Sequence, residues 1–249
     1  MNRTSITGLA CLLAVALTAC AGGGEPPAPS GSPASAPLEA LKEPANSMSV
    51  SPPLSPAPVS AEALAAYRAL LAGEPGALDR PPEGLELHQV TLPPAEELEY
   101  VLLDLDGDGG AELVVQMVAQ PHQFNAVFHY GDGELSCWQY DIMEMSCRDY
   151  PLGDGAMVRQ YDTGTGPNRY SNLYTVFRYL PDGETEECAS LAVHQDTQED
   201  GTEVFTYLVD DAEVDQDTFA AEFEELVGSR LLSLEDWTPA EKRTRPVVH

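Results

Sequence analysis

The 249-residue sequence has few basic residues, with 12 lysines and arginines against 41 aspartates and glutamates and a formal net charge of −29 at pH 7. Nucleic acids and anionic lipid surfaces are bound by clustered basic side chains, so this scarcity argues against both as partners. The apolar fraction of 43% is still large enough for a hydrophobic core, whereas disordered chains combine high charge with few apolar residues. We therefore expect one or two folded domains with an acidic surface.

Several sequence patterns of known chemistry are also missing. The five histidines show no His-x-x-x-His or His-Glu-x-x-His spacing and there is no Cys-x-x-Cys, so a zinc site is not expected. Gly-x-Ser-x-Gly, the Walker loop and the dinucleotide fingerprint do not occur. Asp162-Thr-Gly stands alone, whereas aspartic-protease chemistry needs two carboxylates that share a proton. These gaps favour a binding protein over an enzyme.

The only long apolar run covers residues 6–17 near the N-terminus. Twelve residues are too few to span a bilayer, which takes about 20, but they suit the core of a signal peptide. The segment Leu17-Thr-Ala-Cys20 follows and resembles the bacterial lipoprotein box, in which the cysteine becomes the lipidated first residue. We predict a signal peptide over residues 1–19, a lipid anchor on Cys20, and an exported protein attached to the membrane outside the cytoplasm.

A stretch of low complexity follows the predicted anchor. Residues 21–60 contain 10 Pro, 8 Ser, 7 Ala and 4 Gly, which are residue types that contribute little to a core. Pro-rich segments favour extended polyproline II at about 3.1 Å per residue, so the segment could hold a domain up to roughly 100 Å from the membrane. We predict that residues 20–60 comprise the lipidated cysteine and a disordered tether.

Residues 61–238 carry the pattern of an α+β, β-rich domain. Ser60 can cap a helix that ends at Gly73, and Asp215 or Asp217 can cap a second helix that ends before Gly228. Short Val-, Tyr-, Phe- and Leu-rich runs lie between the two helices and predict strands. The turns are marked by Asp132-Gly133, Asp154-Gly155 and Asp182-Gly183. We predict an antiparallel β-meander with a helix at each end, followed by a flexible tail over residues 239–249.

One short segment carries the clearest chemical signal. It reads Asp104-Leu-Asp106-Gly-Asp108-Gly-Gly-Ala-Glu112. Three carboxylates at alternate positions, with glycines that permit a sharp turn, can fold around a hard cation and supply oxygen ligands. We predict a structural calcium site. Its ligands, at positions one, three, five, seven and nine of a calcium loop, are Asp104, Asp106, Asp108, the carbonyl of Gly110, and Glu112.

The flanks of this loop differ from those of an EF-hand. An EF-hand has a bidentate Glu at position twelve, where this sequence has Val115, and helices on both sides, whereas residues 100–103 and 113–118 read as strands. The motif Asp-x-Asp-Gly-Asp-Gly-x-x-Glu-Leu is similar to the strand-loop-strand calcium site of FG-GAP and VCBS repeats. It is only locally similar to the EF-hand or dockerin loop.

The order of these features resembles a family of bacterial cell-surface lipoproteins whose activities are uncharacterised. Its members carry a lipobox, a low-complexity tether, a short helix, one loop of this type and Tyr-rich hairpins. The resemblance rests on residues 17–20, 102–115, 161–166, 174–183 and 214–228. It implies attachment to the cell envelope and a calcium site, and it implies no particular enzymatic activity.

Three cysteines remain in the exported chain besides Cys20. Cys137 and Cys147 lie symmetrically about Ile142, so a hairpin that turned there would place them opposite each other, and an exported location would permit a disulfide. Free buried thiols are the alternative, and Cys188 is left over in either case.

These features predict a membrane-anchored, calcium-binding module that binds or scaffolds a protein or polymer of the envelope. The alternative is a hydrolase of envelope polymers that uses unidentified carboxylates among the 41 acids. A concave pocket with two carboxyls about 5 to 10 Å apart would favour the hydrolase.

Overall fold

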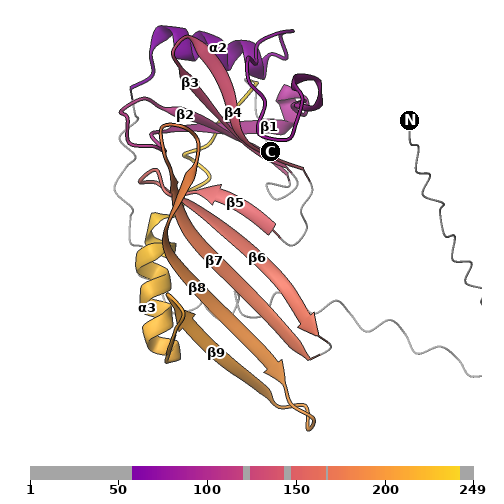
Figure 1. Cartoon of the computed structure of the whole chain (residues 1–249), viewed down its shortest axis with the longest axis vertical. Helices are drawn as coiled ribbons and strands as arrows, with labels where there is room; N and C mark the ends of the chain where they lie inside the picture. Colours follow the sequence, from indigo (N-terminus) through magenta and orange to yellow (C-terminus); the bar gives the residue numbers. More distant parts are fainter. Residues whose placement is uncertain (1–57, 120–123, 143–146, 167, 242–249) are drawn as a thin grey trace, which may run out of the picture. The chain divides into compact units, whose positions relative to one another are not determined.

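The computed structural model describes residues 58–119, 124–142, 147–166 and 168–241 (Figure 1). All of them belong to the compact unit of residues 46–249. The predicted signal peptide, Cys20 and the predicted tether up to residue 57 lie outside the described residues, as do residues 242–249 of the predicted tail. No helix in the described ranges has the length and apolar character needed to cross a bilayer.

The fold is α+β and β-rich, as predicted, and its strands form two antiparallel sheets. The first sheet has the order β11-β1-β2-β3-β4 and the second the order β10-β9-β8-β7-β6-β5. The strands of the first sheet are β1 (Leu98–Leu103), β2 (Glu112–Met117), β3 (Phe124–Gly131), β4 (Glu134–Ile142) and β11 (Thr238–Pro239). Those of the second are β5 (Cys147–Pro151), β6 (Met157–Gly166), β7 (Arg169–Tyr179), β8 (Thr185–Thr197), β9 (Glu203–Val209) and β10 (Ala212–Val214).

Both predicted helices form where their capping residues place them. Helix α2 (Ala61–Leu71) begins after Ser60, whose Oγ accepts a hydrogen bond from the N–H of Ala63 at 3.0 Å. Gly73, with φ of 69°, follows its end. Helix α3 (Gln216–Leu226) uses Asp215 rather than Asp217 as its cap, because the Asp215 carboxylate accepts from Thr218 N–H at 2.8 Å. The short 3₁₀ helices are η1 (Leu87–Gln89), η2 (Ala95–Glu97) and η4 (Gly228–Arg230).

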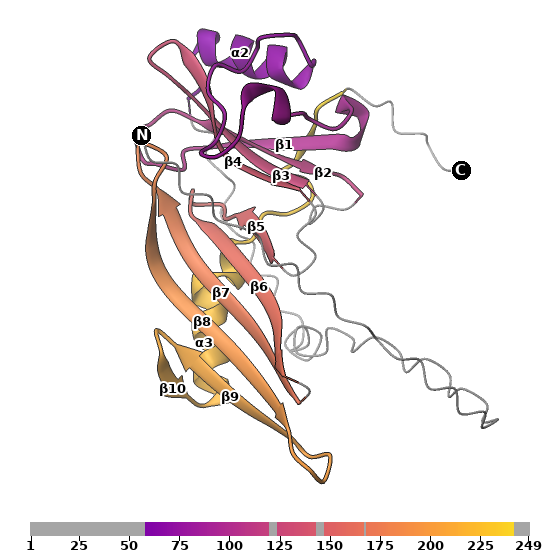
Figure 2. The ribbon, with the colours of Figure 1, turned by 45° about the vertical axis from the view of Figure 1, so that its right-hand side comes forward.

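Each long helix covers one face of one sheet (Figure 2). Helix α2 packs on the first sheet, where its Tyr67 joins a core that includes Leu113 and Phe128. The opposite face of the first sheet packs on the second sheet, where Val114 and Met157 share another core. Side chains alternate along a strand, so Glu112 points with Val114 toward the second sheet. Strand β2 is thus covered on both faces, and five of its six residues are buried.

The three predicted Asp-Gly turns are confirmed. Asp132-Gly133 joins β3 to β4, Asp154-Gly155 lies between β5 and β6, and Asp182-Gly183 lies between β7 and β8. The strands form two consecutive meanders rather than one, because β4 pairs with β3 and β5 pairs with β6. The predicted boundary of the tail is also shifted, since Pro239 pairs with Glu99 in the first sheet.

Of the two alternatives for the cysteines, the one with a hairpin around Ile142 is not formed, because β4 and β5 belong to different sheets. Cys137 lies on β4 of the first sheet, whereas Cys147 lies on β5 of the second sheet and pairs with Tyr161. No disulfide joins Cys137 to Cys147. The Cys137 thiol is buried and donates to the carbonyl of Gln139 at 3.1 Å, and burial raises its pKa to about 12.

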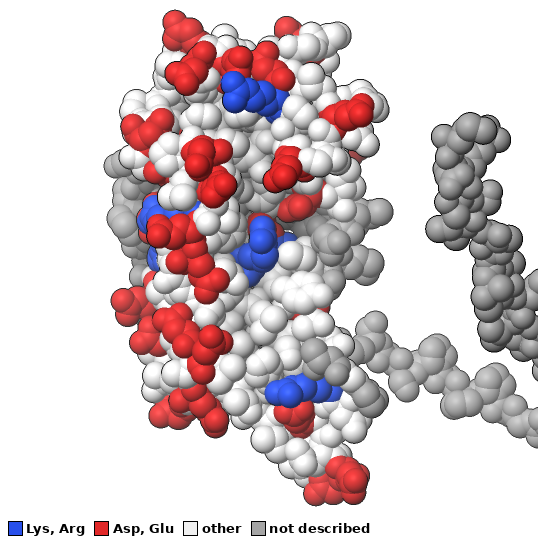
Figure 3. Space-filling view, in the orientation of Figure 1, with Lys and Arg blue, Asp and Glu red and all other residues white. Residues whose placement is uncertain are grey.

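The second half of the chain carries a dense set of exposed acids. Residues 179–228 contain 16 Asp and Glu and no Lys or Arg. In the space-filling view, acidic side chains gather on the side that carries α3 and at the end of the β8–β9 hairpin (Figure 3). Water solvates these carboxylates, so they need no buried partner.

Candidate metal centre

The predicted calcium loop connects β1 to β2 and lies at one end of the first sheet. Leu103 and Glu112 are cross-strand partners, so residues 104–111 form a closed loop between two paired strands. Gly107 and Gly109 have φ of 78° and 89°, in the left-handed region that glycine adopts without steric cost. The strand flanks and the glycines therefore produce the tight loop that the sequence predicts.

The aspartates of the loop turn their carboxylates inward onto its own backbone. Asp104 accepts from Gly107 N–H at 2.7 Å and from Gly109 N–H at 3.1 Å. Asp106 accepts from the N–H of Asp108 at 3.0 Å, and Asp108 accepts from the N–H of Gly110 at 2.5 Å. These hydrogen bonds fix the loop. They also hold three negative charges close together.

Asp104, Asp106 and Asp108 form a group that could hold a metal ion. One oxygen from each of the three lies within 4.8 Å of the others. Asp106 Oδ2 is shielded from solvent and has no hydrogen-bond partner. Burial, the largest effect, raises the pKa of Asp106, and the charges of Asp108 and Asp104 raise it further. A cation would satisfy the unpartnered oxygen and reduce this repulsion.

Glu112, another predicted ligand, is not in the group of three aspartates. Glu112 belongs to a second group with Asp106 and His129, whose ligand atoms also lie within 4.8 Å of one another. Its side chain is 2% exposed, accepts from Leu105 N–H at 2.7 Å and lies 3.0 Å from His129 Nδ1. At Gly110, whose carbonyl is the remaining predicted ligand, a Cβ would lie 2.9 Å from Asp108 Oδ1, so the loop is closely packed there.

His129 is the residue of this centre that sequence reasoning missed. It lies on β3 beside β2 and stacks on Trp138, with ring centroids 4.4 Å apart and planes at 10°. Burial works to lower the pKa of His129, but the hydrogen bond and charge of Glu112 and the charge of Asp106 raise it above its ordinary value. Only the β2–β3 register could have revealed His129, because it pairs Leu113 with Phe128 and so brings Glu112 beside His129.

Two further residues contact the loop from distant parts of the chain. Tyr67 of α2 donates its hydroxyl proton to the carbonyl of Ala111 at 2.8 Å. Gly155, in the β5–β6 turn of the second sheet, lies so close to the loop that a Cβ would be 2.0 Å from the carbonyl oxygen of Asp104. The loop is therefore held between α2 and a turn of the second sheet.

Asp154, next to this turn glycine, is bound by two arginines. Its Oδ2 accepts from Arg178 at 3.0 Å and from Arg230 at 2.6 Å. Burial raises the pKa of Asp154, but the hydrogen bond and charge of Arg230, with the charge of Arg178, hold it below its ordinary value. This ion-pair cluster fixes the turn that touches the loop.

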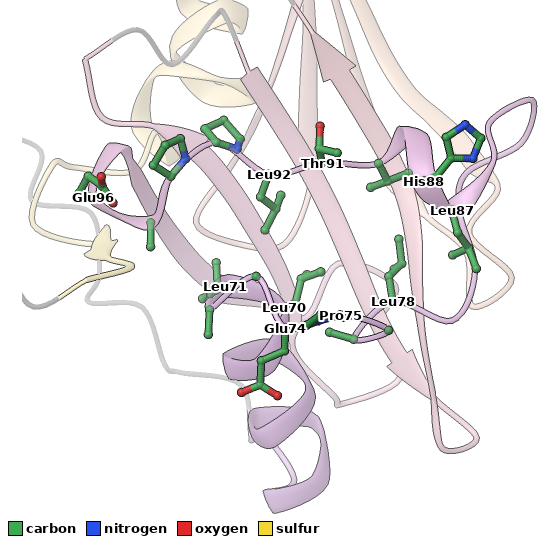
Figure 4. A pocket seen from close by; sticks show the side chains of 18 residues that line it. Leu70, Leu71, Glu74, Pro75, Leu78, Leu87, His88, Thr91, Leu92 and Glu96 are labelled. Atoms are coloured by element: carbon green, nitrogen blue, oxygen red, sulfur yellow. The ribbon is translucent and has the colours of Figure 1, made fainter.

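A pocket of about 780 Å³ lies elsewhere, between the end of α2 and the segment around η1 and η2 (Figure 4). Leu71 and Leu92 are among the leucines and prolines that line it, and no residue of either metal group does. Its two acids, Glu74 and Glu96, are exposed and lie at different sides of the pocket. The pocket offers apolar contacts rather than a facing pair of buried carboxylates.

Comparison of the chain with protein-family models, curated proteins and solved structures gave no match.

Proposed function

We propose that the protein is an exported, lipid-anchored binding or scaffolding module whose β-rich domain is ordered by a calcium ion at the β1–β2 loop. The observation that carries the calcium site is Asp106 Oδ2, a carboxylate oxygen without a partner and shielded from solvent beside two other aspartates. A carboxylate oxygen that is shielded from water and has no hydrogen bond is costly. A cation among these side chains removes that cost.

The donor atoms favour a hard cation at the three aspartates. The three side-chain atoms of this group are all carboxylate oxygens, and calcium is bound by oxygen ligands in flexible geometry, whereas magnesium demands a nearly ideal octahedron. The flexible geometry that calcium accepts suits a short loop that is closed between two paired strands. Asp104, Asp106 and Asp108 would hold the ion, and its charge would offset their mutual repulsion.

The position of the loop suits a structural role for the ion. The loop touches Tyr67 of α2 and Gly155 of the second sheet, so ordering it would stabilise contacts on both sides. Extracellular calcium modules bind at about 10⁻⁴ to 10⁻³ M. A calcium concentration of about 1 mM acting on a site of about 10⁻⁴ M adds about 1.4 kcal/mol of stability.

Location and attachment follow from the N-terminal motif. Lipidation of Cys20 would fix the chain to the membrane, and the Pro-rich segment would let the domain reach a protein or polymer of the envelope. Replacing Cys20 by Ala should release the protein from membranes in cell fractionation. Persistent membrane attachment of the variant would contradict the anchor.

Thermal unfolding of the full chain tests the calcium site. Adding calcium to about 1 mM should raise the melting temperature by about 4 °C. This value follows because the ion adds about 1.4 kcal/mol of stability and each kcal/mol raises the melting temperature by about 3 °C. Asp108→Asn should abolish the rise. Asp182→Asn is the matched control, because both aspartates accept the N–H two residues later in an Asp-Gly turn. An equal rise in wild type and Asp108→Asn, or none in wild type, would contradict the proposal.

A further inference from the structure

The second group of candidate ligands has a different chemistry from the three aspartates of the loop. It combines Asp106 with Glu112 of β2 and His129 of β3, with one ligand atom of each within 4.8 Å of the others. The histidine changes the class of ion that fits, because imidazole nitrogen suits zinc, copper, iron and nickel, whereas calcium and magnesium prefer oxygen. One imidazole and two carboxylates form a mixed N/O donor set.

The geometry of this group suits a small divalent ion. Zinc binds nitrogen and carboxylate oxygen at about 2.0 to 2.2 Å in a tetrahedron, which places neighbouring ligand atoms about 3.3 Å apart. His129 Nδ1 and Glu112 Oε1 are 3.0 Å apart. An ion that replaced the proton between these two atoms would need little movement of either side chain.

The surroundings hold both side chains in place. The N–H of Leu105 binds Glu112 Oε2 at 2.7 Å, which leaves Oε1 toward His129. The His129 ring is stacked on Trp138 and only 15% of its side chain is exposed. Metal sites are tuned by such outer contacts, which orient the ligands and limit solvent access.

Two observations point to an ion rather than to a closed polar cluster. Asp106 Oδ2 is shielded and has no partner. Glu112 is almost fully buried, and His129 is the only cationic side chain within ion-pair distance of it in the described part of the chain. His129 carries at most one positive charge against the two negative charges of Glu112 and Asp106, so a divalent ion would balance the charge of the group more fully.

We propose that Asp106, Glu112 and His129 form a binding site for a divalent transition-metal ion, distinct in ion class from the calcium site and joined to it through Asp106. The absence of a zinc spacing motif from the sequence does not conflict with this site. Its ligands come from a loop and two strands and meet only through the β1–β2–β3 register.

Cobalt and zinc binding to the full chain, with any affinity tag removed, tests this site. In excess calcium, Co²⁺ should produce the visible absorption of cobalt bound by imidazole and carboxylate, and one equivalent of Zn²⁺ should remove it. His129→Gln should weaken Zn²⁺ binding by about 100-fold or more, since losing an outer partner alone costs about 10- to 100-fold. His194→Gln is the matched control, because His194 is also half-buried on a strand and hydrogen-bonded.

Two further variants keep the result interpretable. Glu112→Gln preserves side-chain size and the acceptor for Leu105 N–H, so it should fold and still lose Zn²⁺ affinity if His129→Gln proves unstable. Asp108→Asn should lose the calcium-induced rise in melting temperature and keep Zn²⁺ binding, whereas His129→Gln should do the reverse. Zn²⁺ binding that is absent in wild type, or unchanged in both His129→Gln and Glu112→Gln, would overturn this proposal and leave the calcium site untouched.

Discussion

The two sheets neutralise their buried acids in different ways. In the second sheet, Asp149 is 4% exposed and is bound by Arg159, whose guanidinium donates to both carboxylate oxygens. In the first sheet, Glu112 is 1% exposed and its hydrogen-bond partners in the described residues are a backbone N–H and His129. The second sheet supplies its own positive charge. The first sheet supplies only His129, which carries at most one positive charge beside Glu112 and Asp106.

The largest effect is expected at the contact between the β1–β2 loop of the first sheet and the β5–β6 turn of the second sheet. Gly155→Ala should destabilise the protein by about 4 kcal/mol, because left-handed backbone costs about 1 to 2 kcal/mol for a non-glycine residue and overpacking against Asp104 adds about 1 to 3. Gly201→Ala is the matched control, with the same φ of 84° and no atom near its Cβ position. Urea unfolding that gives equal losses for the two variants would contradict a tight contact at the loop.

Removing Arg159, the cationic partner of Asp149, should have the next largest effect on the free energy of unfolding. Arg159→Met leaves Asp149 buried without its arginine, and losing one partner of a buried pair costs about 3 to 5 kcal/mol. Because half of the Arg159 side chain is exposed, we expect about 3 kcal/mol. Urea unfolding at pH 7 measures this loss. A loss below about 1 kcal/mol would show that Asp149 does not depend on the arginine.

The arginine-bound turn should make stability depend on pH. The folded pKa of Asp154 lies below its ordinary value, so the ion pairs stabilise the protein above the unfolded pKa, and this contribution is lost as pH falls through the folded pKa. Asp154→Asn should cost about 1 kcal/mol at pH 7, because the pairs are partly exposed. The variant and wild type should converge in urea unfolding at acidic pH. A difference that persists there would assign the effect to packing instead.

Glu112 should show the smallest effect in the absence of metal. The Glu112→Gln variant keeps the side-chain shape and the acceptor for Leu105 N–H. It removes a carboxylate whose pKa is raised, chiefly by burial. The measurement is made in the presence of a chelator. Losing one partner of a buried pair is costly when it leaves an unpaired charge, but His129 can release its proton once Glu112 is neutral, so we expect a change below about 1 kcal/mol. A loss as large as that of Arg159→Met would erase the contrast between the sheets.

The local features of the fold were predictable from the sequence because they depend on neighbouring residues. Ser60 and Asp215 cap their helices through hydrogen bonds that span three residues, and the Asp-Gly turns follow from the conformations that these residues adopt. The inward-turned aspartates of the loop are local in the same way, since each binds backbone two to five residues away.

The features that escaped prediction depend on pairing between distant residues. The division into two sheets separates Cys137 from Cys147, and symmetry about Ile142 could not reveal this. His129 reaches Glu112 only through the β2–β3 register, and Gly155 reaches Asp104 only where the two sheets pack. Spacing rules detect candidate ligands that lie close in sequence, and the group that could hold a metal here also includes a histidine from another strand.

The most direct test of calcium binding at the β1–β2 loop is a calorimetric calcium titration of the full wild-type chain and of its Asp106→Asn variant. Asp106 provides the shielded oxygen that has no partner. The account predicts one calcium ion bound by wild type with a Kd of about 10⁻⁴ to 10⁻³ M and no measurable binding by Asp106→Asn. Wild type that binds no calcium, or a variant that binds as well as wild type, would contradict it.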